Sequence, residues 1–476
     1  MLSLRTVASS CCLACLLSIA ACGGSDDGES DDGSAGKGGS AADSGKGGSG
    51  GKAGTGGQGG SGGKAGSAAA GSGGTSGGGS AGNGGAGNAA GSGGSSGGGA
   101  TDPSAELYDP DRLPRFDIDL PDESMDALAA DPDTYAHGTL HYGSETVADV
   151  GIRIKGEATK RTLDKKAAFK IKFDEFVDKQ EFRGLRRLTL NNSVEDPSFI
   201  AERLAFYMFR LAQLPSPRAN SALVYVNGEY FGVYANIETE DKTFLRRWFD
   251  SDAGNLYEEG ESDFEWGHEQ YFDLETNETK NDRSDLTKLF QALEAAESAT
   301  YLKDIDGALD TAHFLRFSAM EAAVDQWDMY AYTFFYPNNF RIYHDPKSDK
   351  LVFLPWGMDL ALKPFLYTNR PHISVFELSY YEDNPKQRVS TGLMFRRCLE
   401  SATCKETYTG VVRDTVKIFD EAKLDAVATK YYDQIKSHVY SETRKELTNA
   451  EFDAAVQSVL TTIRSRTAAM RKDLGE

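Results

Sequence analysis

The chain has 476 residues and a formal net charge of −21, because 72 acidic residues outnumber 51 basic ones. This acidic balance argues against a nucleic-acid-binding surface and against charge-driven binding to anionic lipids. The length allows at least one large folded domain, and the 7 histidines are too scattered to give the ligand spacing of a zinc site.

The first 22 residues predict an export signal that ends in a lipidated cysteine. One early cation, Arg5, is followed by an apolar run from Cys11 to Ala21, which is typical of a signal peptide and too short to span a membrane. The four residues that end at Cys22 read IAAC and resemble a bacterial lipobox. We therefore expect lipidation at Cys22, with an ordinary signal peptide cut near Ala21 as the alternative. Acyl chains contribute about 0.8 kcal/mol per buried methylene, so they would hold the protein on a membrane without a spanning helix.

Residues 23–105 predict a disordered linker. They are Gly, Ser and Ala with scattered Lys and Asp, in near-repeats such as GKAGTGGQGGSGGKAGS. A segment of this composition cannot bury a hydrophobic core and behaves as a flexible tether. We expect it to carry one continuous folded region, residues 106–476, at the bacterial cell envelope, with the outer membrane or the cell surface as the expected location.

The first part of the folded region, residues 106–240, predicts a β-rich lobe. Short alternations of apolar and polar residues predict strands at FDIDL, TYAHGTLHYG, VADVGIRIKG and AAFKIKF. A helix is predicted at residues 198–213, with a start signal at Asp196. Two further strands flank Asn227 and Gly228, a dipeptide typical of a tight β-hairpin.

The second part, residues 241–476, predicts mainly helices. One β-like pair, NNFRIYHD and KLVFLPW, lies among them and is joined by a turn at residues 345–349. Thr448 and Glu451 have the spacing of a capping box at the start of the last helix. Apolar residues recur with helical spacing in four ranges, which are 285–298, 313–327, 422–437 and 452–474.

Only two cysteines remain in the folded region, Cys398 and Cys404. An exported domain folds in an oxidising compartment, so we expect these two thiols to form a disulfide. We assign that disulfide a role in stability.

Five segments in chain order resemble the CotH kinase family. The resemblance covers about residues 150–365 and rests on VGIRIKGEATKRTLDKKAAFKIKF, LTLNNSVEDPSFIAERLA, VYVNGEYFGVYANIE with DAGNLYEEG, NNFRIYHD, and FLPWGMDLAL. It implies an α+β, atypical protein-kinase-like fold with a β-rich N-terminal lobe and a helical C-terminal lobe. It also implies transfer of the terminal phosphoryl group of ATP to Ser or Thr, with Mg²⁺ or Mn²⁺ as the metal.

The resemblance assigns roles to three residues of the second lobe. Phosphoryl transfer needs a carboxylate that orients the attacking hydroxyl, which is the role implied for Asp328, and oxygen ligands for a metal, which are the roles implied for Asp359 and Asn339. Asp359 follows an apolar strand, where a divalent ion could hold a buried carboxylate. Asp325 stays an alternative to Asp328, because the spacing from Asp328 to Asn339 is 11 residues and exceeds the kinase pattern. Many family members carry a second aspartate where this chain has Gly357.

The triphosphate needs cations, and the β-rich lobe offers several lysines. Lys170 lies in AAFKIKF and Glu202 on the following helix, which is the arrangement in which a glutamate steadies a triphosphate-binding lysine. Lys166 and Lys172 compete with Lys170 for this role, and Lys155 is a further candidate for nucleotide binding. The turn after Lys155 contains Gly156 and could close over phosphates.

Two functions from different classes fit these patterns. The first is a surface-tethered protein kinase that uses ATP and acts on an exported protein substrate. The second is a non-catalytic, pseudokinase-like scaffold that binds an envelope or coat protein. In both cases we expect a monomer that is held to the membrane through Cys22 and has no nucleic-acid partner. The folded region contains no nucleophile-elbow motif, which argues against a Ser-His-Asp hydrolase.

Overall fold

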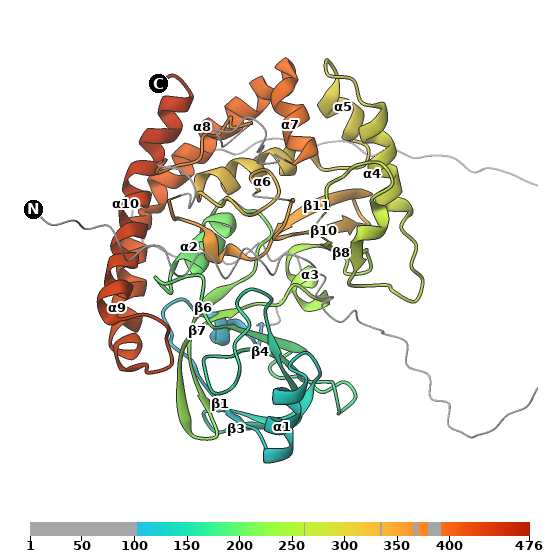
Figure 1. The fold of residues 1–476 in the computed structure, drawn as a ribbon. Helices are drawn as coiled ribbons and strands as arrows, with labels where there is room; N and C mark the ends of the chain where they lie inside the picture. The colour runs from blue at the N-terminus through green and yellow to red at the C-terminus, as the bar shows by residue number, and fades with distance from the viewer. Residues whose placement is uncertain (1–101, 261, 334–335, 365–369, 379–391) are drawn as a thin grey trace, which may run out of the picture. The chain divides into compact units, whose positions relative to one another are not determined.

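The computed structural model describes residues 102–260, 262–333, 336–364, 370–378 and 392–476. These residues belong to one compact unit, in which strands gather in the N-terminal part and helices in the C-terminal part (Figure 1). The expected mixed α+β architecture, with the β-rich part first, is therefore confirmed. The expected signal peptide, Cys22 and residues 23–101 of the expected linker lie outside the described residues.

The N-terminal part is a closed barrel of seven strands in the order β1-β2-β3-β4-β5-β7-β6. Its closure brings β1 beside β6 in parallel, with Phe116 paired to Val224. The sequence pattern predicted neither this closure nor the helix α1 (Asp122–Ala130). The strands are β1 (Arg115–Asp119), β2 (Ala136–Tyr142), β3 (Glu145–Lys155), β4 (Ala168–Lys172), β5 (Arg187–Asn191), β6 (Ala219–Val226) and β7 (Glu229–Ile237).

The β6–β7 hairpin has the predicted tight turn. Asn227 and Gly228 have φ angles of 50° and 80°, the left-handed region that this type of hairpin turn requires. The Asn227 side chain also accepts a hydrogen bond from the Leu120 N–H (2.7 Å) and donates one to the Leu120 carbonyl (2.9 Å). The turn residue therefore ties the hairpin to the end of β1.

Side chains alternate across the barrel wall, so β3, β4 and β5 have two chemically different faces. Ile152 and Ile154 belong to the apolar cluster that fills the barrel. Arg153 and Lys155 lie between and after them and therefore point outward. Lys170 is the direct partner of Arg153 on the neighbouring strand, so it shares the outward face. The barrel thus has a basic strip on its outer wall.

The C-terminal part packs helices around a four-stranded sheet with the order β11-β10-β8-β9. The predicted pair is present as β10 (Phe340–Asp345) and β11 (Lys350–Pro355), whereas β8 (Leu256–Glu259) and β9 (Phe272–Leu274) were not predicted. None of the described helices is both long and apolar enough to cross a membrane. The helices are α2 (Ala201–Leu211), α3 (Lys242–Trp248), α4 (Ser284–Ala295), α5 (Tyr301–Ile305), α6 (Thr311–Ala323), α7 (Leu393–Glu400), α8 (Ala402–Ala422), α9 (Leu424–Ser441) and α10 (Asn449–Asp473), with short 3-10 turns at η2 (Ala105–Tyr108), η3 (Glu269–Tyr271) and η4 (Met358–Leu360).

The helical part is fixed by local devices that the sequence indicated. Thr448 and Glu451 form a capping box at the start of α10, as predicted. Cys398 and Cys404 form a disulfide between α7 and α8. The predicted helix ranges each contain most of an observed helix, but α3, α5, α7 and α8 were not predicted.

Glu442, at the end of α9, joins the helical part to the barrel. Its side chain is fully buried, lies 2.7 Å from the Lys166 ammonium and accepts a hydrogen bond from the Val233 N–H (2.9 Å). The carboxylate fits there because residue 232 is glycine, since a Cβ atom at Gly232 would lie 2.3 Å from the Glu442 Cδ. Gly232 also has a φ angle of 132°.

We expect Gly232→Ala to lower the free energy of unfolding by about 3 kcal/mol or more, because it strains the backbone and displaces a buried ion pair. Urea unfolding measures this loss. Gly410→Ala in α8 is the matched control, since a Cβ there meets nothing within 4 Å, and it should raise stability by about 0.5–1 kcal/mol. Equal effects of the two substitutions would contradict the assigned packing.

Candidate functional site

A lysine, an asparagine and a glutamate form the first part of the candidate site. Lys155 ends β3 and donates a hydrogen bond from its ammonium to the Asn191 side chain. The Asn191 amide donates in turn to both Glu202 carboxylate oxygens, at 3.0 and 3.2 Å. Glu202 lies in the first turn of α2 and is 2% exposed. Burial, and next the charge of Asp359, raise the pKa of Glu202 to about 8, against the opposing effect of Lys155.

The 3-10 turn η4 brings Asp359 to the same place. Burial raises the pKa of Asp359, whereas the charges of Lys363 and Lys155 act in the opposite direction. Lys363 donates to the backbone carbonyls of Asp359 (2.6 Å) and Glu195. Burial, and next the charge of Asp359, raise the pKa of Glu195 to about 7. The site therefore gathers several carboxylates around two lysines.

Asp328 and Asn339 are in contact, as their proposed roles require. The Asn339 amide nitrogen donates to the Asp328 carbonyl at 2.8 Å and to its carboxylate at 3.0 Å. The Asn339 side chain packs over Gly357, where a Cβ atom would lie 2.0 Å from the amide oxygen. Gly357, with a φ angle of 51°, is thus the residue that leaves room for Asn339. An aspartate at this position would need Asn339 to move.

Asp328 and Asp359 lie near the same carboxylate, because the charges of both raise the pKa of Glu195. The structure therefore brings together Asp328, Asn339 and Asp359 from the helical part with Lys155 and Glu202 from the other side. Among these, Lys155, Asp328, Asn339 and Asp359 are half-buried. Such partial exposure lets a soluble ligand reach these side chains, and their electrostatic interactions with it are less screened than at a fully exposed surface.

The other two candidate lysines have different surroundings. Lys166 lies in the buried ion pair with Glu442 and donates to the Val233 carbonyl at 2.9 Å. Lys170 is 2% exposed, and burial, followed by the charge of Arg187, lowers its pKa to about 7. The carboxylates whose charges act on Lys170 in the opposite direction are Glu258 and Glu275 rather than Glu202.

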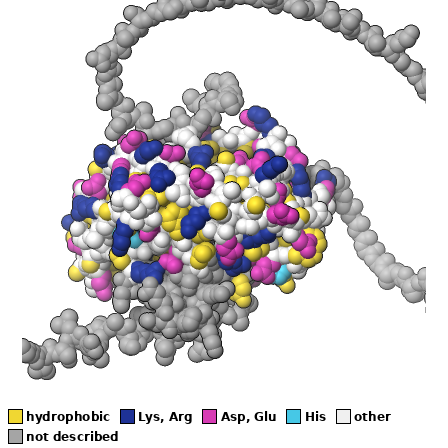
Figure 2. Space-filling view, turned by 90° about the horizontal axis from the view of Figure 1, so that it is seen from above, with side chains coloured by type: hydrophobic (Ala, Val, Ile, Leu, Met, Phe, Trp, Pro, Cys, Tyr) yellow, Lys and Arg dark blue, Asp and Glu magenta, His cyan; other side chains and the backbone are white. Residues whose placement is uncertain are grey.

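Lys170 is part of a second charged network where the barrel wall meets the sheet. Arg341 on β10 is 1% exposed, donates to the Glu258 carboxylate at 3.0 Å and stacks over the Trp356 ring at 4.8 Å. Glu240 is also buried, and its carboxylate lies 3.8 Å from the Arg341 Nε. On the face that Figure 2 draws, by contrast, acidic and basic side chains are interspersed at the surface.

Asp325, the alternative to Asp328, has a structural set of partners. It is 1% exposed, lies 2.7 Å from the His372 Nδ1 and accepts a hydrogen bond from the Ile373 N–H at 3.0 Å. Its other neighbour is the buried Arg466 guanidinium at 3.4 Å. Because both carboxylate oxygens are used in this way, the geometry favours Asp328 for contact with a ligand.

His372 also lies 2.8 Å from the Ser465 hydroxyl, so Asp325, His372 and Ser465 follow the order of a hydrolase triad. Ser465 lies inside α10, and its hydroxyl donates to the Thr461 carbonyl one turn earlier at 2.8 Å. A helical serine that bonds back to the preceding turn is typical of a structural contact. We assign this chain of bonds to holding residues 372–373 against α10.

The oxygen-rich cluster around Asp359 fits a hard divalent cation by its chemistry and by its charge. Asp359, Asp328, Glu195 and Glu202 exceed the nearby lysines in number, and burial keeps the pKa values of three of them raised. A divalent cation would relieve this repulsion, and carboxylate and amide oxygens are the donors that Mg²⁺ prefers. Within the described residues, no group of three or more His, Cys, Asp or Glu side chains is arranged so that these side chains alone could hold a metal ion.

Three residues of the site had no role in the sequence analysis, and they are Asn191, Glu195 and Lys363. The first two lie in the segment NNSVEDP, which begins at the last residue of β5. Asp196 in the same segment was predicted as a helix start signal, and its carboxylate accepts a hydrogen bond from the Ala201 N–H at 2.8 Å. The polar run after an apolar strand was the available signal, but its partners come from other parts of the chain.

Comparisons with known proteins agree with the resemblance seen in the sequence. A family model described as CotH kinase protein matches residues 152–470, a range that begins inside β3 and contains the whole candidate site. The chain is 20% identical over 315 residues to inner spore coat protein H of Bacillus subtilis (strain 168), which covers 63% of this chain and 81% of that protein. It is 32% identical over 90 residues to an inner spore coat protein H-like protein of the same organism, which covers 19% of this chain and 28% of that protein.

Glu240 should give the stability a recognisable pH dependence. Burial raises its pKa from 4.5 to about 8, against the charge of Arg341, and neither carboxylate oxygen has a hydrogen-bond partner among the described residues. The folded state therefore holds a proton that the unfolded chain has already lost between these two pH values. Relative to Glu240→Gln, the wild-type free energy of unfolding should fall by at least about 1.4 kcal/mol, the value of one pKa unit, as the pH rises through this window. Denaturant titrations at several pH values test this, and a difference that does not change with pH would contradict it.

The packing of Asn339 on Gly357 predicts a coupling between the two residues. Gly357→Ala should lower the free energy of unfolding by about 2 kcal/mol, because the new Cβ displaces Asn339 from Asp328 and the alanine adopts a left-handed conformation. In an Asn339→Ala background the same substitution should cost only about 1 kcal/mol, since the clash is gone. A double-mutant cycle measures the difference. Additive effects would show that Asn339 does not depend on Gly357.

Proposed function

Because the chain belongs to the CotH kinase family, we propose that it is an ATP-dependent protein kinase that phosphorylates Ser or Thr of exported proteins. The observation that carries this proposal is the half-buried cluster in which Lys155, Glu202 and Asp359 meet Asp328 and Asn339. Phosphoryl transfer depends mainly on positioning and on electrostatic stabilisation, and this cluster offers a cation, several oxygen donors and a fixed carboxylate.

Lys155 is the lysine that we assign to the triphosphate. Its charge acts on both Glu202 and Asp359, and burial lowers its pKa below the ordinary value. The Asn191 amide holds Glu202, and the Asn191 oxygen accepts from Lys155, so the ammonium is kept at the end of β3. An anionic ligand would favour the charged form of this lysine. Lys166 then serves the buried ion pair with Glu442, and Lys170 belongs to the charged network around Arg341.

Asp359 and Asn339 are the residues that would hold Mg²⁺ or Mn²⁺. The Asn339 nitrogen is used on Asp328, which leaves its oxygen as the donor for a metal. When bound, the metal neutralises charge on the triphosphate. The half-buried carboxylate of Asp359 supplies the negative charge that makes such binding favourable.

Asp328 is the residue that we assign to the attacking hydroxyl. Asn339 fixes its carboxylate at 3.0 Å, and Asn338 lies at 3.4 Å from the same oxygen. Glu321 on α6 fixes the following residues, because its carboxylate accepts hydrogen bonds from the N–H groups of Ala331 (3.0 Å) and Tyr332 (2.8 Å). A carboxylate held in this way can orient a Ser or Thr hydroxyl and accept its proton.

The proposal extends to the fold and to the place of action. The barrel would act as the nucleotide-binding lobe and the helical part as the catalytic lobe of an atypical protein-kinase-like architecture. Lipidation at Cys22 and the Gly/Ser linker would hold the enzyme at the cell envelope, and the relative described as an inner spore coat protein supports a surface role. Exported proteins are therefore the proposed substrates.

We expect Asp359→Asn to abolish the effect of ATP and Mn²⁺ while leaving the apo protein as stable as the wild type or more stable. The neutral amide removes repulsion from Glu202 and Glu195, yet it also removes the charge that a metal needs. In the wild type, ATP with Mn²⁺ at 100 times the dissociation constant should add about 2.7 kcal/mol of stability. Autophosphorylation with labelled ATP should fall by about 100-fold or more in the variant.

Asp349→Asn is the matched control, because Asp349 is an exposed carboxylate on the turn between β10 and β11. It should keep both the thermal shift and the autophosphorylation. Incorporation that is unchanged by Asp359→Asn would remove the assigned role of Asp359. A wild-type chain that shows neither a shift nor incorporation would instead favour a non-catalytic scaffold that binds an envelope or coat protein.

A further inference from the structure

The loop between β3 and β4, residues 156–167, begins directly after Lys155. Gly156 opens it with a φ angle of 105°, and a Cβ there would lie 2.4 Å from the Thr159 hydroxyl. The Asn192 amide donates to the Thr159 carbonyl at 3.0 Å and to the Lys166 carbonyl at 2.9 Å. One side of the loop is therefore tied to the segment after β5, close to Asn191.

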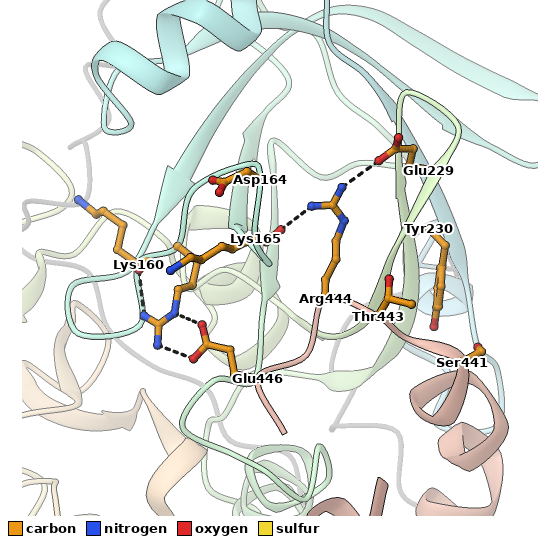
Figure 3. A pocket seen from close by; sticks show the side chains of 10 residues that line it. Lys160, Asp164, Lys165, Glu229, Tyr230, Ser441, Thr443, Arg444 and Glu446 are labelled. Carbon is orange, nitrogen blue, oxygen red and sulfur yellow. Dashed lines mark hydrogen bonds and ion pairs between the residues drawn. The ribbon is translucent and has the colours of Figure 1, made fainter. Parts of the chain in front are cut away.

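The other side of the loop is held by the connection between α9 and α10, residues 442–448 (Figure 3). The Arg444 guanidinium donates from one nitrogen to the carbonyls of Leu163 and Lys165, both at 3.0 Å. The Arg161 guanidinium forms two hydrogen bonds with the Glu446 carboxylate. These bonds reach both the backbone and the side chains of the loop.

Glu442 fixes the end of the loop more deeply. Its fully buried carboxylate lies 2.7 Å from the Lys166 ammonium, and the same ammonium lies 4.3 Å from the centre of the Phe199 ring. A buried ion pair of this kind costs several kcal/mol if one partner is lost, so it determines where the chain enters β4. The loop thus runs from Lys155 in the candidate site to Lys166 in this anchor.

The two segments and the start of β7 line an open polar pocket of about 1120 Å³. Two arginines of its wall are engaged with carboxylates of the protein, because Arg161 bonds Glu446 and Arg444 bonds Glu229 at 2.8 Å. Figure 3 shows the bonds of Arg444 to Lys165 and to Glu229, which tie the α9–α10 connection to the loop and to β7. The arrangement therefore holds together two segments whose contacting residues, Leu163 and Arg444, lie 281 residues apart in the sequence.

We propose that Glu442 and Arg444 are positioning residues, which fix the β3–β4 loop so that Lys155 faces Glu202 and Asp359 before a nucleotide binds. This inference rests on the proposed kinase function. A loop without such anchors would open at little cost in free energy. The free energy needed to order it again would then lower the affinity for the nucleotide. The α9–α10 connection thereby determines the position of Lys155 at the end of β3.

The experiment compares Arg444→Ala with Glu229→Gln in the full chain. Arg444→Ala removes the bonds to the loop backbone, whereas Glu229→Gln removes only the ion pair of Arg444 with an exposed glutamate (71% exposed side chain). Arg444→Ala should raise the KM for ATP about tenfold, equivalent to about 1.4 kcal/mol, with kcat changed less than twofold. Glu229→Gln should leave both parameters at the wild-type values.

Amide hydrogen exchange gives a second readout that does not depend on ATP. Exchange at residues 157–165 should become at least about tenfold faster in Arg444→Ala and stay unchanged in Glu229→Gln. Unchanged exchange in Arg444→Ala, or a fall in kcat without a change in KM, would overturn the positioning role. If the wild type shows no effect of ATP, the kinase proposal fails, and the exchange data still decide whether Arg444 fixes the loop.

Discussion

The burial of charge against the outer wall of the barrel is the constraint on which the rest of this structure depends. Strand alternation places Arg153, Lys155 and Lys170 on that wall, and the barrel interior takes the apolar residues between them. An ammonium or guanidinium that leaves water needs a carboxylate nearby, or its pKa falls. The sheet supplies Glu258 to this face, and α2 supplies Glu202. The two parts of the folded region therefore have to dock in one register for these charges to be compensated.

The compensation is incomplete at one end, and this is where the candidate site lies. Around Arg341 the buried cations and carboxylates are close in number, and the side chains of Arg341 and Glu240 are almost fully buried. Around Asp359 the carboxylates outnumber the lysines, and several side chains remain half-exposed. The excess negative charge around Asp359 favours binding of a cation from solution, because water reaches this site. The network around Arg341, in which the charges are balanced, instead stabilises the packing of the two parts. The same docking thus produces a structural network and a binding site side by side.

Two glycines make this arrangement possible. Gly357 and Gly232 each lie where a Cβ would collide with a polar side chain from a distant segment, Asn339 in one case and Glu442 in the other. Both glycines have positive φ angles, so they serve the backbone and the contact together. Absence of a side chain at these positions is what lets an amide and a carboxylate enter otherwise packed regions. The contacts explain why glycine fits at position 357 when Asn339 has the observed orientation.

The sequence by itself determined the features that depend on neighbours in the chain. The β6–β7 turn at Asn227, the capping box at Thr448 and the alternation that turns Lys155 outward are set within a few residues. The family resemblance also pointed to Asp328, Asn339 and Asp359. Only the tertiary structure decided which lysine faces these residues, because the local sequence around Lys155, Lys166 and Lys170 does not indicate their distant partners Glu202, Glu442 and Glu258. Barrel closure, α8 and the roles of Asn191 and Lys363 were likewise decided by contacts between remote segments. Those contacts depend on which oppositely charged groups lie close together in the folded chain. A local sequence pattern carries no information on this.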